Sequence, residues 1–393
     1  MRFDQRILAM LLISGTVSLI GADIQPAAAG LTVHEWGTFT SIAGENGMAV
    51  DWSPLDGPTD LPCFVHRFEF GAKANLGGTV RMETPVIYLY SASTTTADIR
   101  VTFRNGFITE WYPKANRVAS YFGSGIPPKG PDIRQPYANE PDSIAWPEVK
   151  LAPAIESPPF PFEFTSSHYY AARSTDAAPL LVGREREKFL FYRGVGRFQP
   201  PIAVWARAGN QILVRNLTAD PIPAVILFQN QDGKISYRVH GPIETHTTLE
   251  SPQLSDLGSL KTEMERMLLS QGLFPKEAIA MVATWSDSWF EEGTRLFYIT
   301  PTSALDLVLP LEVKPAPTQI ARVFVGRMEL FTPSTRKAIT DAMQQGDWRP
   351  LQKYGRFLEP IAASMGPGPW TKPLDSMRVE YLQRESACGN SNW

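Results

Sequence analysis

The sequence is short of cysteine, of histidine and of long apolar runs, and each shortage excludes a class of protein. Two cysteines among 393 residues are too few for a cysteine-based zinc site. Only 20% of residues are charged and the net charge is −3, which excludes a disordered polyelectrolyte and argues against the basic face of a nucleic-acid-binding protein. No stretch after the N-terminus is long and apolar enough to span a bilayer. We therefore expect no nucleic-acid partner and no integral membrane protein after processing.

The first thirty residues have the three parts of a secretory signal peptide. Arg2 and Arg6 are basic, residues 7–20 are mostly apolar and uncharged, and small alanines end at Ala29. The apolar run is shorter than the roughly 20 residues of a membrane-spanning helix, so an anchor is the weaker interpretation. We expect cleavage near Ala29 and a periplasmic or extracellular location.

Cys63 and Cys388 lie near opposite ends of the exported chain, in a compartment where disulfides form. Either they are bridged, which would close a long loop and restrict the unfolded chain, or they are two unpaired thiols. The sequence leaves both alternatives open.

Residues 30–250 predict a β-rich domain, because runs of β-branched and aromatic residues alternate with turn signals. Asn105-Gly106, Gly209-Asn210 and Asp232-Gly233 each predict the turn of an antiparallel hairpin. Consecutive hairpins favour a β-sandwich or an open barrel. Residues 123–161 are rich in proline, which interrupts central strands, and we expect a loop that covers the sheet or a passive linker.

Residues 251–393 predict a smaller α+β part, because the apolar period changes from two to about 3.6 after residue 251. The stripe from Leu257 to Leu268 predicts a helix that Gly272 ends, and Pro275 opens a second helix, giving a helical hairpin. Strands are expected over 294–300, 305–313 and 320–331, with a further helix over 335–345 capped by Ser334. The fold class is therefore mainly β to α+β.

Three glutamates on apolar strand faces are the first candidates for catalysis. A two-residue turn at Asn105-Gly106 would place Glu110 on the apolar face of its hairpin. Glu83 alternates with Pro85, Ile87 and Leu89, and Glu35 with Val33 and Phe39. A buried carboxylate pairs with an arginine, binds a cation or keeps a proton with a raised pKa, and the last option makes a general acid.

The segment 284–293 places acids beside tryptophans, an arrangement that sugar-binding clefts use. Asp287 is the fourth candidate catalytic residue, and Trp285 and Trp289 are candidates for stacking on a sugar ring, as are Trp36 and Trp111. Rings stack on the apolar face of a sugar while carboxylates act as acid and base. The alternative is a buried tryptophan anchor with solvated acids.

Histidine gives a weaker indication of a metal site. His34, His66 and His240 have glutamates nearby in the sequence, but no spacing matches a specific ligand motif. A bound divalent metal is possible, no ligand set is assigned, and no other cofactor is expected.

Three short sequence segments are distinctive: His34 to Thr40, Met82 to Tyr88 and Asp287 to Gly293. They resemble phrases of a group of exported bacterial proteins without a known activity, and the resemblance implies export alone. Together the observations predict binding or hydrolysis of a glycan or other cell-envelope component. A non-catalytic envelope or matrix interaction protein is the alternative, and a metalloprotein is the third hypothesis.

Overall fold

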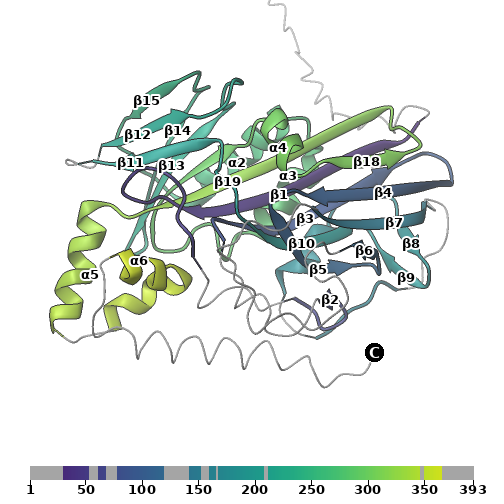
Figure 1. Ribbon diagram of the computed structural model, residues 1–393, viewed down its shortest axis with the longest axis horizontal. Coiled ribbons are helices and arrows are strands. Elements are labelled where there is room, and N and C mark those ends of the chain that lie inside the picture. The colour runs from purple at the N-terminus through teal and green to yellow at the C-terminus, as the bar shows by residue number, and fades with distance from the viewer. Residues whose placement is uncertain are drawn as a thin grey trace, which may run out of the picture.

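The structure is a computed structural model that describes residues 30–52, 61–67, 78–118, 141–151, 159–164, 167–207, 211–345 and 349–364. The fold is mainly β with helices packed around the sheets (Figure 1), which confirms the predicted class. None of the helices in these ranges is both long enough and apolar enough to cross a membrane. Cys388 lies outside the described residues, so the Cys63–Cys388 disulfide stays a prediction.

A ten-stranded mixed sheet forms the middle of the molecule, in the order β16-β14-β13-β17-β19-β1-β3-β10-β5-β2. Its strands are β1 (Thr32–Ile42), β2 (His66–Arg67), β3 (Val80–Tyr90), β5 (Gly106–Tyr112), β10 (Leu190–Gly196), β13 (Val225–Gln231), β14 (Lys234–His240), β16 (Gln253–Leu254), β17 (Gly293–Ile299) and β19 (Gln319–Leu330). β1 and β19 are parallel, and the other neighbours are antiparallel. The sheet therefore continues across the boundary expected near residue 250.

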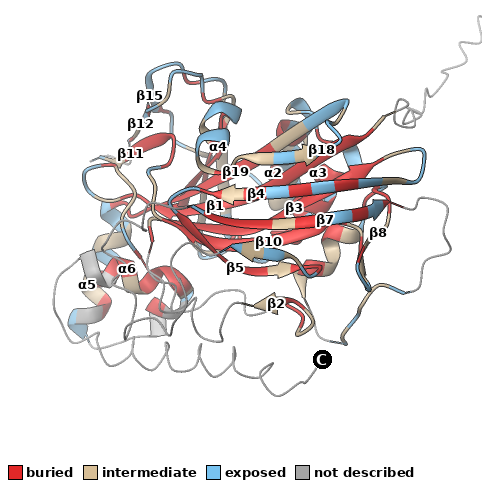
Figure 2. Ribbon diagram, turned by 45° about the vertical axis from the view of Figure 1, so that its right-hand side comes forward, coloured by how far each residue is buried: buried red, intermediate tan, exposed pale blue. Residues whose placement is uncertain are grey.

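Two smaller sheets pack on one face of the large sheet, which makes a β-sandwich. The six-stranded sheet holds β4 (Thr95–Phe103), β6 (Asn116–Val118), β7 (Asp142–Leu151), β8 (Leu180–Val182), β9 (Glu185–Glu187) and β18 (Leu311–Lys314). The three-stranded sheet holds β11 (Ile202–Ala206), β12 (Ile212–Asn216) and β15 (His246–Leu249). Each shares an apolar core with the large sheet, whose strands β1, β3, β10 and β17 are wholly buried (Figure 2).

Helices η1 (His168–Arg173), α2 (Leu257–Ser270) and α3 (Pro275–Thr284) cover the opposite face of the large sheet. Helices α5 (Pro333–Gln345), η3 (Arg349–Phe357) and α6 (Leu358–Ser364) cover one end. Helix α4 (Thr302–Val308) lies on the sandwich face, where Leu305 joins the core shared with the six-stranded sheet. The α2–α3 hairpin confirms the prediction, because Leu260, Met264 and Leu268 form the buried stripe that faces the core. The tight turn of β13 and β14 at Asp232-Gly233 is also confirmed.

The hairpin expected at Asn105-Gly106 is wrong in its pairing. β4 pairs with β7 and β18 in the six-stranded sheet, whereas β5 pairs with β10 and β2 in the large sheet. Asn105 has the positive φ of a tight turn, but the chain crosses there from one layer of the sandwich to the other. A local turn signal specifies the reversal of the chain and not the partner strands. β11 and β12 do pair, although their turn lies outside the described residues.

Two further segments differ from expectation. The proline-rich stretch contains strand β7, because Pro147 lies beside a β-bulge where Glu148 has φ 52° and the ladder register shifts; proline is tolerated at bulges. Apart from residues 141–151 and 159–161, that stretch lies outside the described residues. Residues 305–313 were expected as one strand, but α4 ends at Val308 and β18 begins at Leu311.

Gly326 on β19 gives the first testable prediction. A Cβ atom there would lie 1.9 Å from Cζ of the Tyr298 ring on the neighbouring strand β17. Gly326→Ala is expected to lower the free energy of unfolding by about 1–3 kcal/mol through overpacking, measured by urea denaturation. The control is Gly241→Ala, where no atom lies within 4 Å of the added Cβ. Equal unfolding midpoints for the two variants would contradict the packing.

Candidate functional site

A band of charged side chains crosses the helix-covered face of the large sheet. We call it the charge band, and it consists of Arg81, Glu83, Glu110, Arg193, Arg295, Arg327 and Glu329 on the strands, with Glu291 and Arg356 covering them. All nine except Glu291 are at least 96% buried. The same strand faces carry the apolar core under α2 and α3, so the face has an apolar half and a charged half.

Arg295 anchors the turn that follows helix α3. Its Nε and Nη2 atoms donate to both carboxylate oxygens of Glu329, at 2.8 and 3.2 Å. Its Nη1 donates to the carbonyls of Trp289 and Glu291, and its Nη2 to that of Glu292, at 2.7–2.8 Å. The N–H groups of the Arg295 guanidinium therefore all have protein acceptors, and these bonds hold the turn that contains Glu291 against the sheet.

Arg327 lies two residues before Glu329 on the same face of β19 and is fully buried. Its Nη2 donates to Glu291 Oε2 at 2.9 Å and lies 3.6 Å from Glu329 Oε2. Its Nε and Nη1 atoms have no hydrogen-bond acceptor among the described residues. Burial and the positive charges of Arg295 and Arg356 lower the pKa of Arg327 to about 10.

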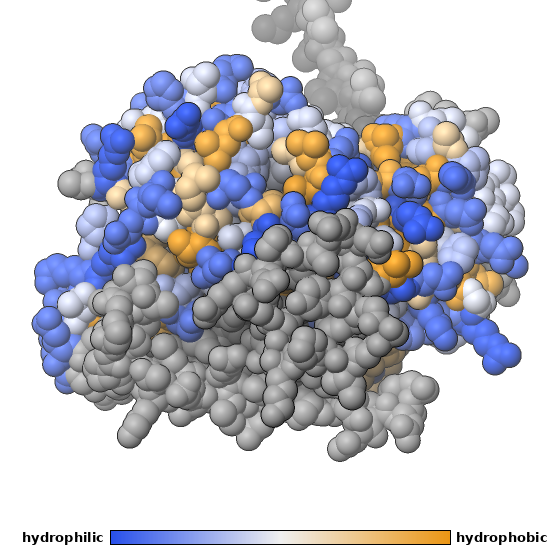
Figure 3. Space-filling view, in the orientation of Figure 1, coloured by the Kyte–Doolittle hydropathy of each residue, from blue (hydrophilic) through white to orange (hydrophobic). Residues whose placement is uncertain are grey.

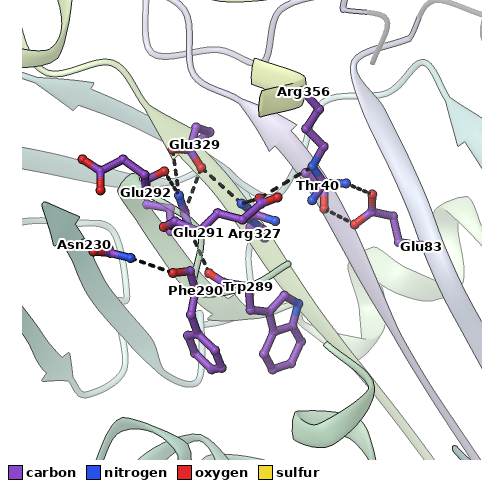
Figure 4. Close-up of polar contacts among 11 residues, drawn as sticks. Thr40, Glu83, Asn230, Trp289, Phe290, Glu291, Glu292, Arg327, Glu329 and Arg356 are labelled. Atoms are coloured by element: carbon purple, nitrogen blue, oxygen red, sulfur yellow. Dashed lines mark hydrogen bonds and ion pairs between the residues drawn. The ribbon is translucent and has the colours of Figure 1, made fainter. Parts of the chain in front are cut away.

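Arg356 reaches the band from helix η3, outside the sheet. Its Nη1 donates to Glu83 Oε1 at 2.5 Å, and Thr40 Oγ1 donates to the second oxygen at 2.7 Å. Arg356 Nε and Nη2 have no hydrogen-bond acceptor within the described part of the chain, although Nε lies 3.9 Å from Glu291 Oε2. Figure 4 shows the Arg356 guanidinium between the Glu83 and Glu291 carboxylates, with Arg327 beside that of Glu291.

The electrostatics of Glu83 follow from these contacts. Burial alone would raise the pKa of the Glu83 carboxyl, but the Arg356 and Arg327 charges and the Thr40 hydroxyl outweigh it. The result is a pKa of about 2. The same two arginines also lower the pKa of Glu291 against its burial. Both carboxylates are therefore ionised at neutral pH.

Glu83 and Glu110 are brought onto one face of the sheet, while Glu35 is on the other. A β-bulge at Thr84, where φ is 45°, places Glu83 on the sheet face opposite to that of Ile87 and Leu89, so the predicted shared face is wrong. Glu110 is paired with Arg193 across β5 and β10, and it accepts a hydrogen bond from Thr109. Glu35 accepts from Tyr192 Oη at 2.5 Å and from Arg322 Nε at 2.7 Å in a closed group on the opposite face.

Asp287 lies outside the band. Its side chain is 58% exposed, and its carboxylate lies 3.2 Å from His168 Nδ1. The catalytic role of the four acids stays a prediction.

Three of the four candidate tryptophans are core residues. Trp36, Trp285 and Trp289 are fully buried in the cluster beneath the helices, and the Trp285 and Trp289 rings are stacked with 12° between their planes. Trp289 points away from the carboxylates (Figure 4). Trp111 is partly buried, with the His66 ring stacked at 6.4 Å and the Arg117 guanidinium at 5.9 Å.

The described residues contain no group of three or more histidine, cysteine or acidic side chains that could hold a metal ion. His34 Nδ1 is 2.7 Å from buried Glu277, and His66 Nε2 is 2.9 Å from Glu185.

Sequence reasoning missed the arginines and Glu329. The signal available was that β17 and β19 place Arg295, Arg327 and Glu329 inside runs of apolar residues, where charge is rare unless paired. Arg356 follows a segment without strand or helix signals, and nothing local connects it to Glu83, 273 residues earlier.

Comparisons with known proteins add no function. No protein-family model matches the chain, and no curated protein matches its sequence. The zebrafish (Danio rerio) Fcho1 mu homology domain with bound Eps15 peptide matches with 8% identity and a TM-score of 0.30, covering 76% of this chain and 96% of that one. The yeast delta-COP-I mu-homology domain, complexed with a Dsl1 WxWxV peptide, matches with 7% identity and a TM-score of 0.29, covering 77% and 98%. Structural similarity at this level does not indicate a function for this chain.

The low pKa of Glu83 predicts a pH dependence of stability. Because its folded pKa is below the unfolded value near 4.5, its ion pair contributes fully above pH 4.5 and is lost as pH falls toward 2. A shift of this size corresponds to about 3 kcal/mol. In urea denaturation, the free energy of unfolding is expected to fall as the pH is lowered from 7 to 2.5. Glu83→Gln should make this fall smaller.

Glu83→Gln should also lower the free energy of unfolding at pH 7 by about 3–5 kcal/mol, because it leaves buried arginine charge uncompensated. The control is Glu244→Gln, at an exposed glutamate. An unchanged acid slope in Glu83→Gln would show that the ion pair does not hold in solution.

Proposed function

We propose that this protein is exported and binds an anionic glycan of the cell envelope at the charge band, without hydrolysing it. The single observation that carries the proposal is that Arg327 and Arg356, both buried, keep guanidinium N–H groups that have no hydrogen-bond acceptor among the described residues. The predicted export places the protein among envelope polymers, many of which carry carboxylates or phosphates.

An oxyanion is the ligand that these arginines fit. A buried donor without an acceptor costs about 1–3 kcal/mol, more when it is charged, so a ligand that supplies oxygens relieves that cost. Guanidiniums bind carboxylate and phosphate through two parallel hydrogen bonds. The Phe357 ring centroid lies 4.9 Å from the Arg327 guanidinium and 5.0 Å from that of Arg356, so one aromatic ring packs against both.

Glu291 marks the side from which a ligand would approach. Its side chain is 33% exposed, whereas those of Arg327 and Arg356 are 0% and 3% exposed. The Glu291 carboxylate already sits on Arg327 at 2.9 Å, in the manner that a ligand carboxylate would. We therefore expect a competing anion to approach along Glu291 and to displace its carboxylate from Arg327.

The electrostatics favour binding over hydrolysis. A glycosidase needs one carboxyl group that keeps its proton near neutral pH to protonate the leaving group. In the charge band the arginines instead lower the pKa values of Glu83 and Glu291. Three of the four candidate tryptophans are also buried in the core, where they do not stack on a sugar.

Titration calorimetry with an acidic oligosaccharide tests the site. Oligogalacturonate is expected to bind and a neutral maltooligosaccharide is not, with affinity falling as salt rises. Arg356→Lys keeps a positive charge beside Glu83 but loses the planar fork, and should weaken binding at least tenfold. A phosphate-bearing polymer run in parallel separates phosphate from carboxylate recognition.

The matched control is Arg266→Lys, at an arginine whose side chain is 66% exposed on α2, with thermal unfolding recorded for both variants. Equal affinities for Arg356→Lys and Arg266→Lys, or no binding of either anionic polymer by the natural chain, would refute the proposal. Release of new reducing ends that Glu110→Gln abolishes would establish hydrolysis instead of binding.

Export has its own test. Expression with the complete N-terminus in a bacterial host should give a mature protein whose N-terminal sequence begins near Gly30, just before strand β1 begins at Thr32. The control replaces Ala27 and Ala29 with bulky residues, which should retain the precursor. A mature protein that starts at Met1 in the cytoplasm would contradict export.

A further inference from the structure

A hollow lies on the opposite face of the large sheet from the charge band. It is a cavity of about 240 Å³ between the sheet, helix α4 and the segment that joins β10 to β11. Its lining residues are Phe39, Phe198, Gln199, Pro200, Pro201, Leu217, Thr218, Tyr298, Thr300, Ala304, Leu307 and Val308. None of these residues carries a charge, and most are apolar. On the face seen in Figure 3, apolar side chains interrupt the hydrophilic surface.

Two buried hydroxyl groups in the lining have no hydrogen-bond partner among the described residues. They are Tyr298 Oη and Thr300 Oγ1, whose residues are 0% and 3% exposed. Tyr298 is in β17 and Thr300 follows that strand directly, so the two lie two residues apart and project from the same face. Buried hydroxyls are normally paired, and here they belong to the wall of a cavity.

The wall is built around the Tyr298 ring. Gly326, paired with Tyr298 across β17 and β19, leaves no side chain beneath the ring, which lies where any Cβ would be. Phe39 and Phe198 meet edge to face at 5.4 Å and form an aromatic wall. Leu307, 67% exposed on α4, stands at the rim.

We propose that this cavity binds a small, uncharged and mainly apolar molecule that carries one hydroxyl or carbonyl group. A cavity of about 150 Å³ lined by apolar side chains holds benzene, so the volume here suits a single substituted ring or a short branched chain. The Tyr298 hydroxyl donates to the ligand oxygen, and Thr300 donates or accepts beside it. Burial raises the pKa of Tyr298, which keeps its proton in place as a donor.

The ligand class differs from that of the charge band, which takes an anion on the other face. A charged molecule would lose its hydration in the cavity without gaining an opposite charge. Binding of an uncharged molecule in this cavity is therefore independent of anion binding at the charge band.

The test compares p-cresol with toluene, which differ by one hydroxyl, binding to the full chain by titration calorimetry or ligand-observed NMR. The natural chain is expected to bind p-cresol at least fivefold more tightly than toluene. Tyr298→Phe and Thr300→Val remove the hydroxyls with little change of shape and should abolish that preference while toluene affinity is kept. Neither probe binding to the natural chain, or an unchanged preference in both variants, would overturn the proposal.

A filling variant provides the second arm. Ala304→Phe projects a ring from α4 into the cavity and should remove binding of both probes, whereas Ala283→Phe on the exposed side of α3 should leave both unchanged. Retained binding in a folded Ala304→Phe chain would place the probes elsewhere and reject the site. If Ala304→Phe does not fold, the two hydroxyl variants decide the question.

Discussion

The ion pair between Arg295 and Glu329 is the interaction on which the charged half of the sheet depends. It joins neighbouring strands β17 and β19 through two hydrogen bonds, and the same guanidinium holds three carbonyls of the turn at 289–292. A buried ion pair repays its desolvation only when its remaining donors are also satisfied, and Arg295 meets that condition. It therefore fixes the position of Glu291, which contacts Arg327 and Arg356, two arginines with N–H groups that lack an acceptor among the described residues.

The division of one sheet face into an apolar and a charged half follows from how the strands are covered. Under α2 and α3 the strands present Trp36, Tyr88, Phe191 and Val325, whereas farther along the same strands they present Thr40, Glu83, Arg193 and Arg327. Helix η3 and the turn at 289–292 cover this second half with Arg356 and Glu291. A network of this kind is more specific in geometry than an apolar core, because every misplacement leaves charge unpaired.

Local signals in the sequence predicted local structure, and contacts between distant segments escaped them. Gly272 and Pro275 bounded the α2–α3 hairpin, and Asp232-Gly233 gave the β13–β14 turn. The predicted face of Glu83 was wrong because the bulge at Thr84 shifts a period-two pattern by one residue. The alternation of apolar and polar residues alone does not indicate a bulge. The parallel pairing of β1 with β19 and the bond from Arg356 to Glu83 join residues more than 270 positions apart. Such contacts are specified by the whole core and by no short motif.

The unbroken register of β17 against β19 separates the charge band from the uncharged cavity. It runs from Thr294 opposite Leu330 to Ile299 opposite Val325 without a bulge. Adjacent residues of a strand face opposite sides, so β19 gives Gly326 to the uncharged cavity and Arg327 to the charge band. A slip of one residue would exchange the two faces, placing a guanidinium against the Tyr298 ring and an apolar side chain among the glutamates. The Arg295–Glu329 pair and the fit of Tyr298 over Gly326 each exist in one register alone, so the two sites together hold the strands in the alignment that both require.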